Sequence, residues 1–525
     1  MRVTLGGQFD AKRGGQFERN LQLSLEMRFT LSFFLFFITF SAFSQNRNSI
    51  WCFGDSAGID FRDTINPAPF VSAMDGRGSC VSICDSMGAL QFYADTYMPL
   101  AIAYVWNANH DTLLNSDSII SDGVYNELQI VPFSGNNDKY YLIYTGWPVY
   151  YDGIYYSVID MNLDQGLGAV VIKNIQIDSN RIADCLQAVK HANGRDWWLI
   201  SKLSSTNYTQ HNRFLVYLIT PDNISPEITF DFNDATDLDF QKIIFNPDNT
   251  KVMVINVRGY MCEYDFDRCT GIVNNPRLIY PEITTVPYNR LLWEGSYSPD
   301  GNIFYVTTAR WTGVAESYLI QYDLNSIDIP NSADTIDMTY APIGPGAVRL
   351  APDGKIYYSR AYESPHLNSF PYADSMYNYI NMNLSVINNP NSIGVACDFQ
   401  PFSFYLGGKR TYYGLPNNPN YDLGPVIGSV CDSLLNSVQV FNKSEHLIEV
   451  YPTPVRNGNF TISYPIVRSE SGLEIIDMEG NVIVKYQLPR YSSYKHLDLP
   501  SISSGIYLAR MISVSGSWSV KFLVE

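Results

Sequence analysis

Short apolar segments joined by the same kind of turn recur along the middle of the chain. In each of the three clearest copies, a Pro-Asp-Gly or Pro-Asp-Asn turn lies between two apolar segments. These copies span residues 245–254, 297–306 and 350–359. Proline presets one turn dihedral, and Gly or Asn tolerates the positive φ that a neighbouring turn position requires. Each copy therefore predicts a β-hairpin.

The hairpins recur at a constant spacing. Pro247, Pro299 and Pro352, the turn prolines of the three clear copies, are 52 and 53 residues apart. A period near 50 residues is long enough for four short strands and is typical of β-propeller blades. An array of two-sheet sandwiches is the competing architecture, but it gives no reason for one turn to recur at a fixed distance.

Looser copies of the hairpin precede the clear ones, at residues 84–93, 133–143 and 190–200. Six hairpins are therefore visible between Gln45 and about Arg410, a span of roughly 365 residues that would hold about seven units of this period. We predict an all-β, seven-bladed propeller in which the two ends of the segment could complete the missing blade by pairing with each other. Six or eight blades are the alternatives.

The chain is expected to divide into four regions. After the propeller, a Pro- and Asn-containing stretch predicts a linker, and alternating apolar and polar positions predict a small antiparallel β-sandwich. The regions are an N-terminal extension with a signal peptide (1–44), the propeller (45–410), the linker (411–446) and the sandwich (447–525).

Composition agrees with a β-protein and excludes one class of partner. Aromatic residues make up 14% of the chain and charged residues 17%, a mixture that suits strands better than helical bundles. The formal net charge is -17. Electrostatic binding of nucleic acid needs clustered Lys and Arg, and the sequence has no such cluster. We therefore expect no nucleic-acid partner.

The N-terminal region contains a signal-peptide pattern. Met27-Arg28 precedes an apolar run over residues 29–40, and small residues follow at the positions that a signal peptidase reads. This pattern predicts a signal peptide over about 27–44, with cleavage between Ser44 and Gln45. Residues 1–26 lack signal character and are interpreted as an upstream extension. No other apolar stretch approaches membrane-spanning length, so no transmembrane span is expected in the mature chain.

The last 76 residues carry a second targeting pattern. Its segments are Val450–Pro454, Gly458–Ile462, Leu473–Gly480, Leu497–Leu499, Ser504–Arg510 and Lys521–Val524. This pattern resembles the type A C-terminal sorting domain of the type IX secretion system. The resemblance implies a Bacteroidota protein that interacts with the type IX secretion machinery and is secreted or held at the outer-membrane surface.

The propeller region has a resemblance of its own. Its segments include Trp51–Gly54, Val105–His110, Tyr156–Met161, Ala188–Gly194, Leu384–Asn391 and Gly414–Asn417. They resemble a family of Bacteroidota extracellular propellers, which commonly carry a type IX sorting domain or occur among gliding-motility-associated surface proteins. The resemblance implies the fold and the location. It assigns no catalytic residues, because the family has no generally assigned ones.

Eight cysteines would reach an oxidising compartment after export. Cys80 and Cys84 lie in one strand-like run, where an extended backbone holds them roughly 13 Å apart, beyond disulfide reach. They are not expected to pair with each other. The sequence leaves the other pairings open.

Two groups of residues are weak candidates for binding. The first is an acidic segment with carboxylates at Asp231, Asp234, Asp237 and Asp239, which could supply oxygen ligands to calcium, although a solvated acidic loop between blades is the preferred interpretation. The second comprises Trp147, Tyr150 and Tyr151, which could stack on sugar rings or peptide side chains, and His191, which precedes a predicted turn. Core packing is the alternative for both the aromatic residues and the histidine.

No catalytic constellation is visible in the sequence. It lacks a nucleophile elbow, and no histidine has a second ligand at metal-binding spacing. The leading hypothesis is a non-enzymatic propeller whose rim loops bind a protein or glycan. The alternative is a secreted hydrolase or lyase that acts on polysaccharide. Carboxylates, His or Tyr converging in the central funnel would favour the enzyme.

Overall fold

The computed structural model describes most of the propeller and of the C-terminal region. The described residues are 46–97, 101–123, 126–136, 138–146, 151–221, 223–282, 291–308, 316–362, 377–432, 448–456, 458–464, 471–488, 494–499, 502–513 and 516–525. The predicted signal peptide and its cleavage site, Ser44 and Gln45, lie outside them. The chain forms two compact units, residues 1–433 and 434–525, which are treated separately below.

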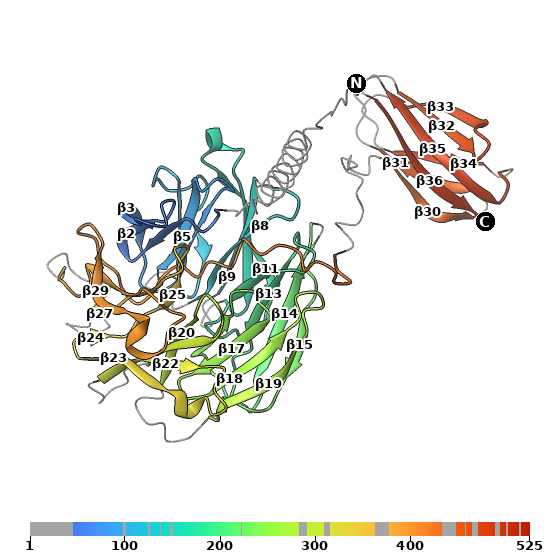
Figure 1. Ribbon diagram of the computed structural model, residues 1–525. Coiled ribbons are helices and arrows are strands. Elements are labelled where there is room, and N and C mark those ends of the chain that lie inside the picture. The colour runs from blue at the N-terminus through green and yellow to red at the C-terminus, as the bar shows by residue number, and fades with distance from the viewer. Residues whose placement is uncertain are drawn as a thin grey trace, which may run out of the picture. The chain divides into compact units, whose positions relative to one another are not determined.

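The first unit is a seven-bladed β-propeller, which confirms the predicted fold and blade number. Antiparallel pairing joins neighbouring strands within each blade (Figure 1). Blades 1–4 contain β1 (Ile50–Phe53), β2 (Asp55–Asp60), β3 (Ala68–Asp75); β4 (Cys80–Cys84), β5 (Leu90–Tyr97), β6 (Ile102–Asn107), β7 (Ile119–Ile120); β8 (Leu128–Pro132), β9 (Lys139–Thr145), β10 (Ile154–Asp160), β11 (Ala169–Asp178); and β12 (Gln187–Lys190), β13 (Trp197–Lys202), β14 (Arg213–Ile219), β15 (Ile228–Asp231).

Blades 5–7 complete the ring. Their strands are β16 (Gln241–Phe245), β17 (Lys251–Asn256), β18 (Met261–Phe266), β19 (Val273–Tyr280); β20 (Leu292–Tyr297), β21 (Ile303–Thr308), β22 (Glu316–Asp323), β23 (Asp334–Tyr340); and β25 (Val348–Leu350), β26 (Ile356–Tyr358), β28 (Asn383–Ile387), β29 (Phe399–Tyr405). A separate two-stranded sheet pairs β24 (Ile343–Gly344) with β27 (Ala361–Tyr362).

The six hairpins expected from the sequence are the first hairpins of blades 2–7. In the three clear copies, Phe245 pairs with Val252, Tyr297 with Phe304, and Leu350 with Ile356. The turn residues Asn249, Gly301 and Gly354 have φ values of 56°, 73° and 77°. Positive φ at these positions is the property for which the sequence pattern selects Gly or Asn.

Each blade buries both faces of its first strands, because neighbouring blades pack against one another. Buried aromatic and branched side chains fill these spaces; Trp197 and Tyr217 are each 1% exposed. The burial patterns of β4, β8, β13 and β21 show no exposed position. This explains why these strands read as continuous apolar runs rather than as alternating ones.

Blade 1 is completed from both ends of the described propeller. The N-terminal side supplies three strands, and residues 410–418 run antiparallel to β1 along its inner side. Arg410 forms a β-bridge with Asp55 at one end, and Asn418 Nδ2 donates to Asn48 Oδ1 at the other, over 2.7 Å. Asn417 N also donates to the Cys80 carbonyl of blade 2, over 2.9 Å. The contact between the two ends thus consists of one isolated β-bridge and single hydrogen bonds, and blade 1 itself is a three-stranded sheet.

Residues 411–432 do not form the linker that we expected. They belong to the propeller unit and, with Arg410, make up what we call the closing segment (residues 410–432), the orange trace through the middle of the propeller in Figure 1. Tyr421 is 2% exposed and packs on Trp197. The segment ends at a disulfide between Cys269 and Cys431. Six cysteines in the described chain are free and buried, and Cys80 and Cys84 do not pair with each other.

The second unit is a seven-stranded β-domain. Its strands follow the order β33-β32-β35-β36-β30-β31-β34 and are antiparallel except where β30 meets β36. They are β30 (Glu449–Arg456), β31 (Asn459–Ser463), β32 (Ser471–Asp477), β33 (Val482–Leu488), β34 (Tyr494–Asp498), β35 (Gly505–Ser513) and β36 (Gly516–Val524). A single core, which includes Phe460, Leu473 and Phe522, lies between the strands.

Candidate functional site

The first strands of blades 2–7 and the closing segment line a central channel that has two distinct ends. The turns of the first hairpins of blades 2–7, such as residues 298–302, lie at one end, which we call the hairpin face. The connections that lead from the last strand of one blade into the first strand of the next lie at the other end, which we call the connection face. Polar side chains from several connections meet at the connection face, and a cavity lies beside the closing segment.

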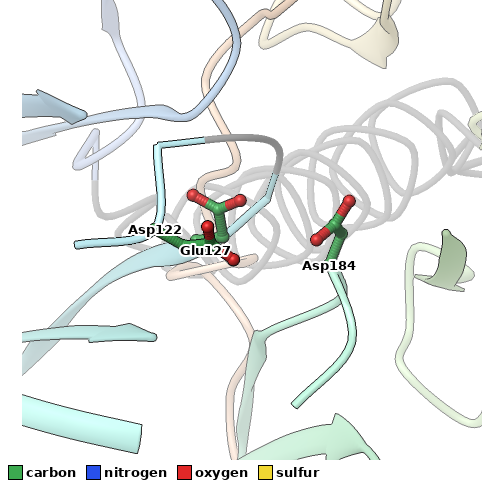
Figure 2. A group of neighbouring side chains, drawn as sticks. All are labelled: Asp122, Glu127 and Asp184. Atoms are coloured by element: carbon green, nitrogen blue, oxygen red, sulfur yellow. The ribbon is translucent and has the colours of Figure 1, made fainter. Parts of the chain in front are cut away.

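Three carboxylates converge at the connection face. Asp122 and Glu127 lie in the connection before β8, and Asp184 lies in the connection before β12. One carboxylate oxygen from each lies within 4.8 Å of the other two, and all three side chains are buried. Figure 2 shows Asp122 and Glu127 close together and Asp184 facing them from the other connection. We call these residues the carboxylate cluster.

Charged and amide groups from blades 3 to 7 surround the cluster. Lys242 Nζ donates to the Asp184 carbonyl over 2.9 Å and lies 4.0 Å from carboxylate oxygens of both Asp184 and Glu294. Arg349 binds Glu294 over 2.8 Å and Asn126 Oδ1 over 2.7 Å. Asn126 Nδ2 in turn donates to Glu294 over 2.7 Å. These groups form a polar network beside the cluster, and Lys242 links the two through Asp184 and Glu294.

Burial makes ionisation of Asp122 and Asp184 unfavourable. Desolvation, together with the nearby charges of Asp184 and Asp239, raises the pKa of Asp122 to about 8. Desolvation also raises the pKa of Asp184 to about 7, although Lys242 opposes the shift. Carboxyl groups with such raised pKa values, placed together in a concave site, are a recognised mark of function.

The cluster can perform two kinds of chemistry. It offers only oxygen ligands, which suit a hard divalent cation better than zinc or copper. Without a cation, paired carboxyl groups of which one is protonated and one is ionised can act as a general acid and a general base. The convergence of three carboxylates at the channel is the kind of observation that favours an enzyme.

A cavity of about 500 Å³ lies deeper in the channel. One wall is formed by β16, β20 and β25, and the opposite wall by residues 417–422 of the closing segment. Asn126 and Arg349 separate it from the carboxylate cluster, and the exposed residues Arg62 and Met87 lie at its rim. We call this space the channel cavity.

Amide and aromatic side chains dominate the lining of the channel cavity. Nine lining residues are Asn or Gln, whereas only Arg62, Arg349 and Asp422 are charged. Several amides hold the closing segment in place; Asn420 Nδ2, for example, donates to the Pro247 carbonyl over 2.8 Å. The aromatic lining residues are Phe61, Phe245, Tyr297 and Tyr421. This lining suits a neutral, polar ligand with apolar faces.

The four aspartates of the acidic segment bind separate protein partners. Asp231 pairs with Arg213, and Asp234 accepts from Asn212, Tyr260 and Tyr264. Asp237 accepts from Thr209, and Asp239 accepts from Arg181 and Ser204. The described structure does not bring the four carboxylates together at one point. Asp239 alone approaches the carboxylate cluster, because its backbone carbonyl accepts from Asp184 N.

The rim candidates have different positions. Trp147 and Tyr150 lie outside the described residues, and Tyr151 is 47% exposed, in the connection between β9 and β10. His191 is 8% exposed; its Nδ1 accepts from Asn193 N and its Nε2 lies 3.0 Å from the Cys269 carbonyl. Burial lowers the pKa of His191. These contacts fix a turn beside the disulfide, which agrees with the structural alternative for this residue.

Sequence reasoning missed the carboxylate cluster because its members are far apart in the chain. Asp184 lies 57 residues after Glu127 and carries no local motif. A signal was nevertheless available in the repeat. Glu127, Asp184 and Asp239 each stand one to three residues before the first strand of a blade. Equivalent positions in successive blades face the same channel, so aligning the repeats by their first strands would have revealed the convergence.

The C-terminal unit matches a known domain family. Residues 449–525 match the family of secretion system C-terminal sorting domains. The chain is therefore a β-propeller protein with a type IX sorting tail, and the tail indicates export to a secreted or cell-surface location. The tail also implies interaction with the type IX secretion machinery. Among the residues that the structure describes, no helix is both long and apolar enough to cross a membrane.

Solved structures resemble the chain only distantly. They include a candidate 6-phosphogluconolactonase from Bacteroides fragilis (10% identity, TM-score 0.41, 70% of this chain and 96% of the other). A periplasmic gluconolactonase from Pseudomonas aeruginosa has 10% identity, a TM-score of 0.31 and coverage of 78% and 95%. A quinoprotein alcohol dehydrogenase-like protein from Bacteroides thetaiotaomicron has 12% identity, a TM-score of 0.35 and coverage of 66% and 73%. These scores carry no argument about activity. A search of curated protein sequences found no match.

Proposed function

We propose that the exported propeller binds an extracellular glycan or protein and that the channel cavity forms part of the binding site. The observation that carries this proposal is the cavity of about 500 Å³ beside the closing segment, with exposed residues at its rim. Small-molecule sites typically have volumes of about 300–1,000 Å³. The exposed residue Tyr151 lies in the β9–β10 connection, at the connection face, and does not border this cavity, so it is a separate candidate contact.

The chemistry of the lining favours a glycan over a charged ligand. Sugar hydroxyls exchange hydrogen bonds with amides, and the apolar faces of sugar rings stack on aromatic side chains. The lining has nine amide residues and four aromatic ones, against three charged residues. A strongly acidic ligand would also meet the net charge of -17.

Binding by the purified mature chain tests this proposal. Glycan and peptide arrays identify a ligand, and isothermal titration calorimetry compares the wild type with Gln187→Leu, which removes a polar side chain from the cavity lining. Gln400→Leu, on the outer strand of blade 7, is the matched control. We expect Gln187→Leu to weaken binding and Gln400→Leu to leave it unchanged. Equal affinities for all three proteins would exclude the cavity as the site.

An enzyme that acts on polysaccharide, by hydrolysis or elimination, is the second candidate. The convergence of Asp122, Glu127 and Asp184 on the channel favours it, because both reactions need positioned acid and base groups. A polysaccharide-degradation screen separates the two functions. Product formation that is lost in Asp184→Asn would establish the enzyme. Ligand binding without product would support the binding protein.

A further inference from the structure

We infer that Asp122, Glu127 and Asp184 bind one hard divalent cation, such as Ca²⁺, at the connection face. The spacing of the three carboxylates carries the first step. Calcium binds oxygen at about 2.3–2.6 Å, so two oxygens on one ion can lie up to about 5 Å apart. The ligand oxygens of the carboxylate cluster lie within 4.8 Å of one another. Three oxygens equally spaced around one ion at 2.6 Å lie about 4.5 Å apart, so an ion between the three carboxylates needs only small side-chain adjustments to contact all of them.

A second observation concerns Asp122 itself. Its side chain is only 9% exposed, and no described residue donates a hydrogen bond to its carboxylate, which faces the other two carboxyl groups in Figure 2. By comparison, Glu127 accepts from Gly123 N over 3.1 Å. A buried carboxylate without a donor is costly unless a cation or proton compensates it. Asp122 thus lacks a protein partner at the point where an ion would sit.

The surrounding charges are consistent with a divalent ion. Asp122, Glu127, Asp184, Asp239 and Glu294 provide five formal negative charges. Arg181, Lys242 and Arg349 provide three formal positive charges. With every group ionised, two negative charges are left without compensation, and a divalent cation would neutralise them in place of the protons that the buried carboxyl groups otherwise retain.

Lys242 does not occupy the position of the ion. Its ammonium donates to the Asp184 backbone carbonyl and stays 4.0 Å from the nearest Asp184 carboxylate oxygen, beyond direct hydrogen bonding. On its other side, Lys242 Nζ lies 4.0 Å from the Glu294 carboxylate. That carboxylate accepts hydrogen bonds from Asn126 and Arg349. Lys242 therefore lowers cation affinity through its charge, but it does not donate a hydrogen bond to the Asp184 carboxylate.

Calorimetric titration of the mature chain, stripped with EDTA and dialysed, tests the inference with CaCl₂, MgCl₂ and MnCl₂. We expect one equivalent of Ca²⁺ to bind and thermal unfolding to shift upward in its presence. Asp122→Asn should weaken binding about tenfold or more, because ligand charge sets affinity in oxygen sites. Asp231→Asn, in the acidic segment, is the matched control and should bind like the wild type.

The melting temperature, measured in EDTA and in calcium, distinguishes a cation ligand from a residue that only stabilises the fold. Asp122→Asn removes a buried charge beside Asp184, so without cation it should melt at or above the wild-type temperature, and it should lose the upward shift in calcium. Asp184→Asn should behave in the same way. Absence of binding of all three cations to the wild type at millimolar concentration would overturn the inference. Wild-type affinity in Asp122→Asn would overturn it as well.

Discussion

The disulfide between Cys269 and Cys431 should contribute strongly to the stability of the propeller. It joins blade 5 to the end of the closing segment, and 162 residues separate its cysteines in sequence. The substitution Cys269→Ser/Cys431→Ser removes the link with little change in side-chain volume. Backbone contacts such as Val426 N to the Ala192 carbonyl, over 2.8 Å, stay available to hold the segment in the folded state.

The magnitude follows from loop closure in the unfolded chain. A crosslink over about 160 residues removes chain entropy equivalent to about 5 kcal/mol at 25 °C, and native disulfides contribute about 2–5 kcal/mol when measured. The propeller spans about 390 residues (46–432), and unfolding entropy is about 2.1 cal/mol/K per residue, so 1 kcal/mol corresponds to about 1.2 °C. The double variant should therefore melt roughly 3–6 °C below the wild type.

Scanning calorimetry with and without reductant measures this difference. Reductant should lower the wild-type melting temperature and leave that of the double variant unchanged, which serves as the control. Alkylation of the unfolded, unreduced protein followed by intact-mass analysis should label the six free cysteines, and all eight after reduction. Equal melting temperatures for the two proteins, or eight labelled cysteines before reduction, would refute the reasoning.

Three further predictions concern the closing segment, a buried lysine and the sorting tail. Gly414→Ala should lower the free energy of unfolding by about 2 kcal/mol or more, because the added Cβ would clash with the Gly78 carbonyl oxygen. At Gly424 an added Cβ meets no atom within 4 Å, so Gly424→Ala should leave the free energy of unfolding unchanged. Denaturant melts measure both variants. Burial lowers the pKa of Lys202 to about 8. Above that pH the unfolded chain binds more protons than the folded chain, so Lys202 should make the free energy of unfolding rise between pH 8 and about 10.5. Lys202→Met should lack this rise when the free energy of unfolding is measured against pH. Parallel curves for the two proteins would contradict this. Deletion of residues 449–525, the matched sorting domain, should leave the protein in the periplasm on fractionation, and its normal appearance outside the cell would disprove the sorting role.

The repeat made the propeller predictable because local chemistry determines each hairpin. Turn positions such as Gly301 need a positive φ, and apolar runs such as Ile303–Val306 need burial on both faces. Both requirements are written within about ten consecutive residues, so a single sequence reveals them. The sorting tail is predictable for a related reason, since its pattern of strands and turns is contiguous.

The route of the closing segment and the carboxylate cluster were not predictable in this way. Residues 411–432 have few strand-like features, because they pack through single hydrogen bonds such as Asn417 N to the Cys80 carbonyl. We therefore interpreted them as a linker. Asp122 and Asp184 come together only because the ring returns each connection to the same channel. Disulfide pairing likewise depends on where the segment ends, and the spacing of the cysteines does not contain that information.

A crystal structure of the mature chain with the glycan or peptide selected on the arrays tests the central claim most directly. Our account predicts that the ligand lies in the channel cavity, between β16 and residues 417–422 of the closing segment. A ligand bound only to outer strands such as β19 or β29, or to the C-terminal domain, would contradict it.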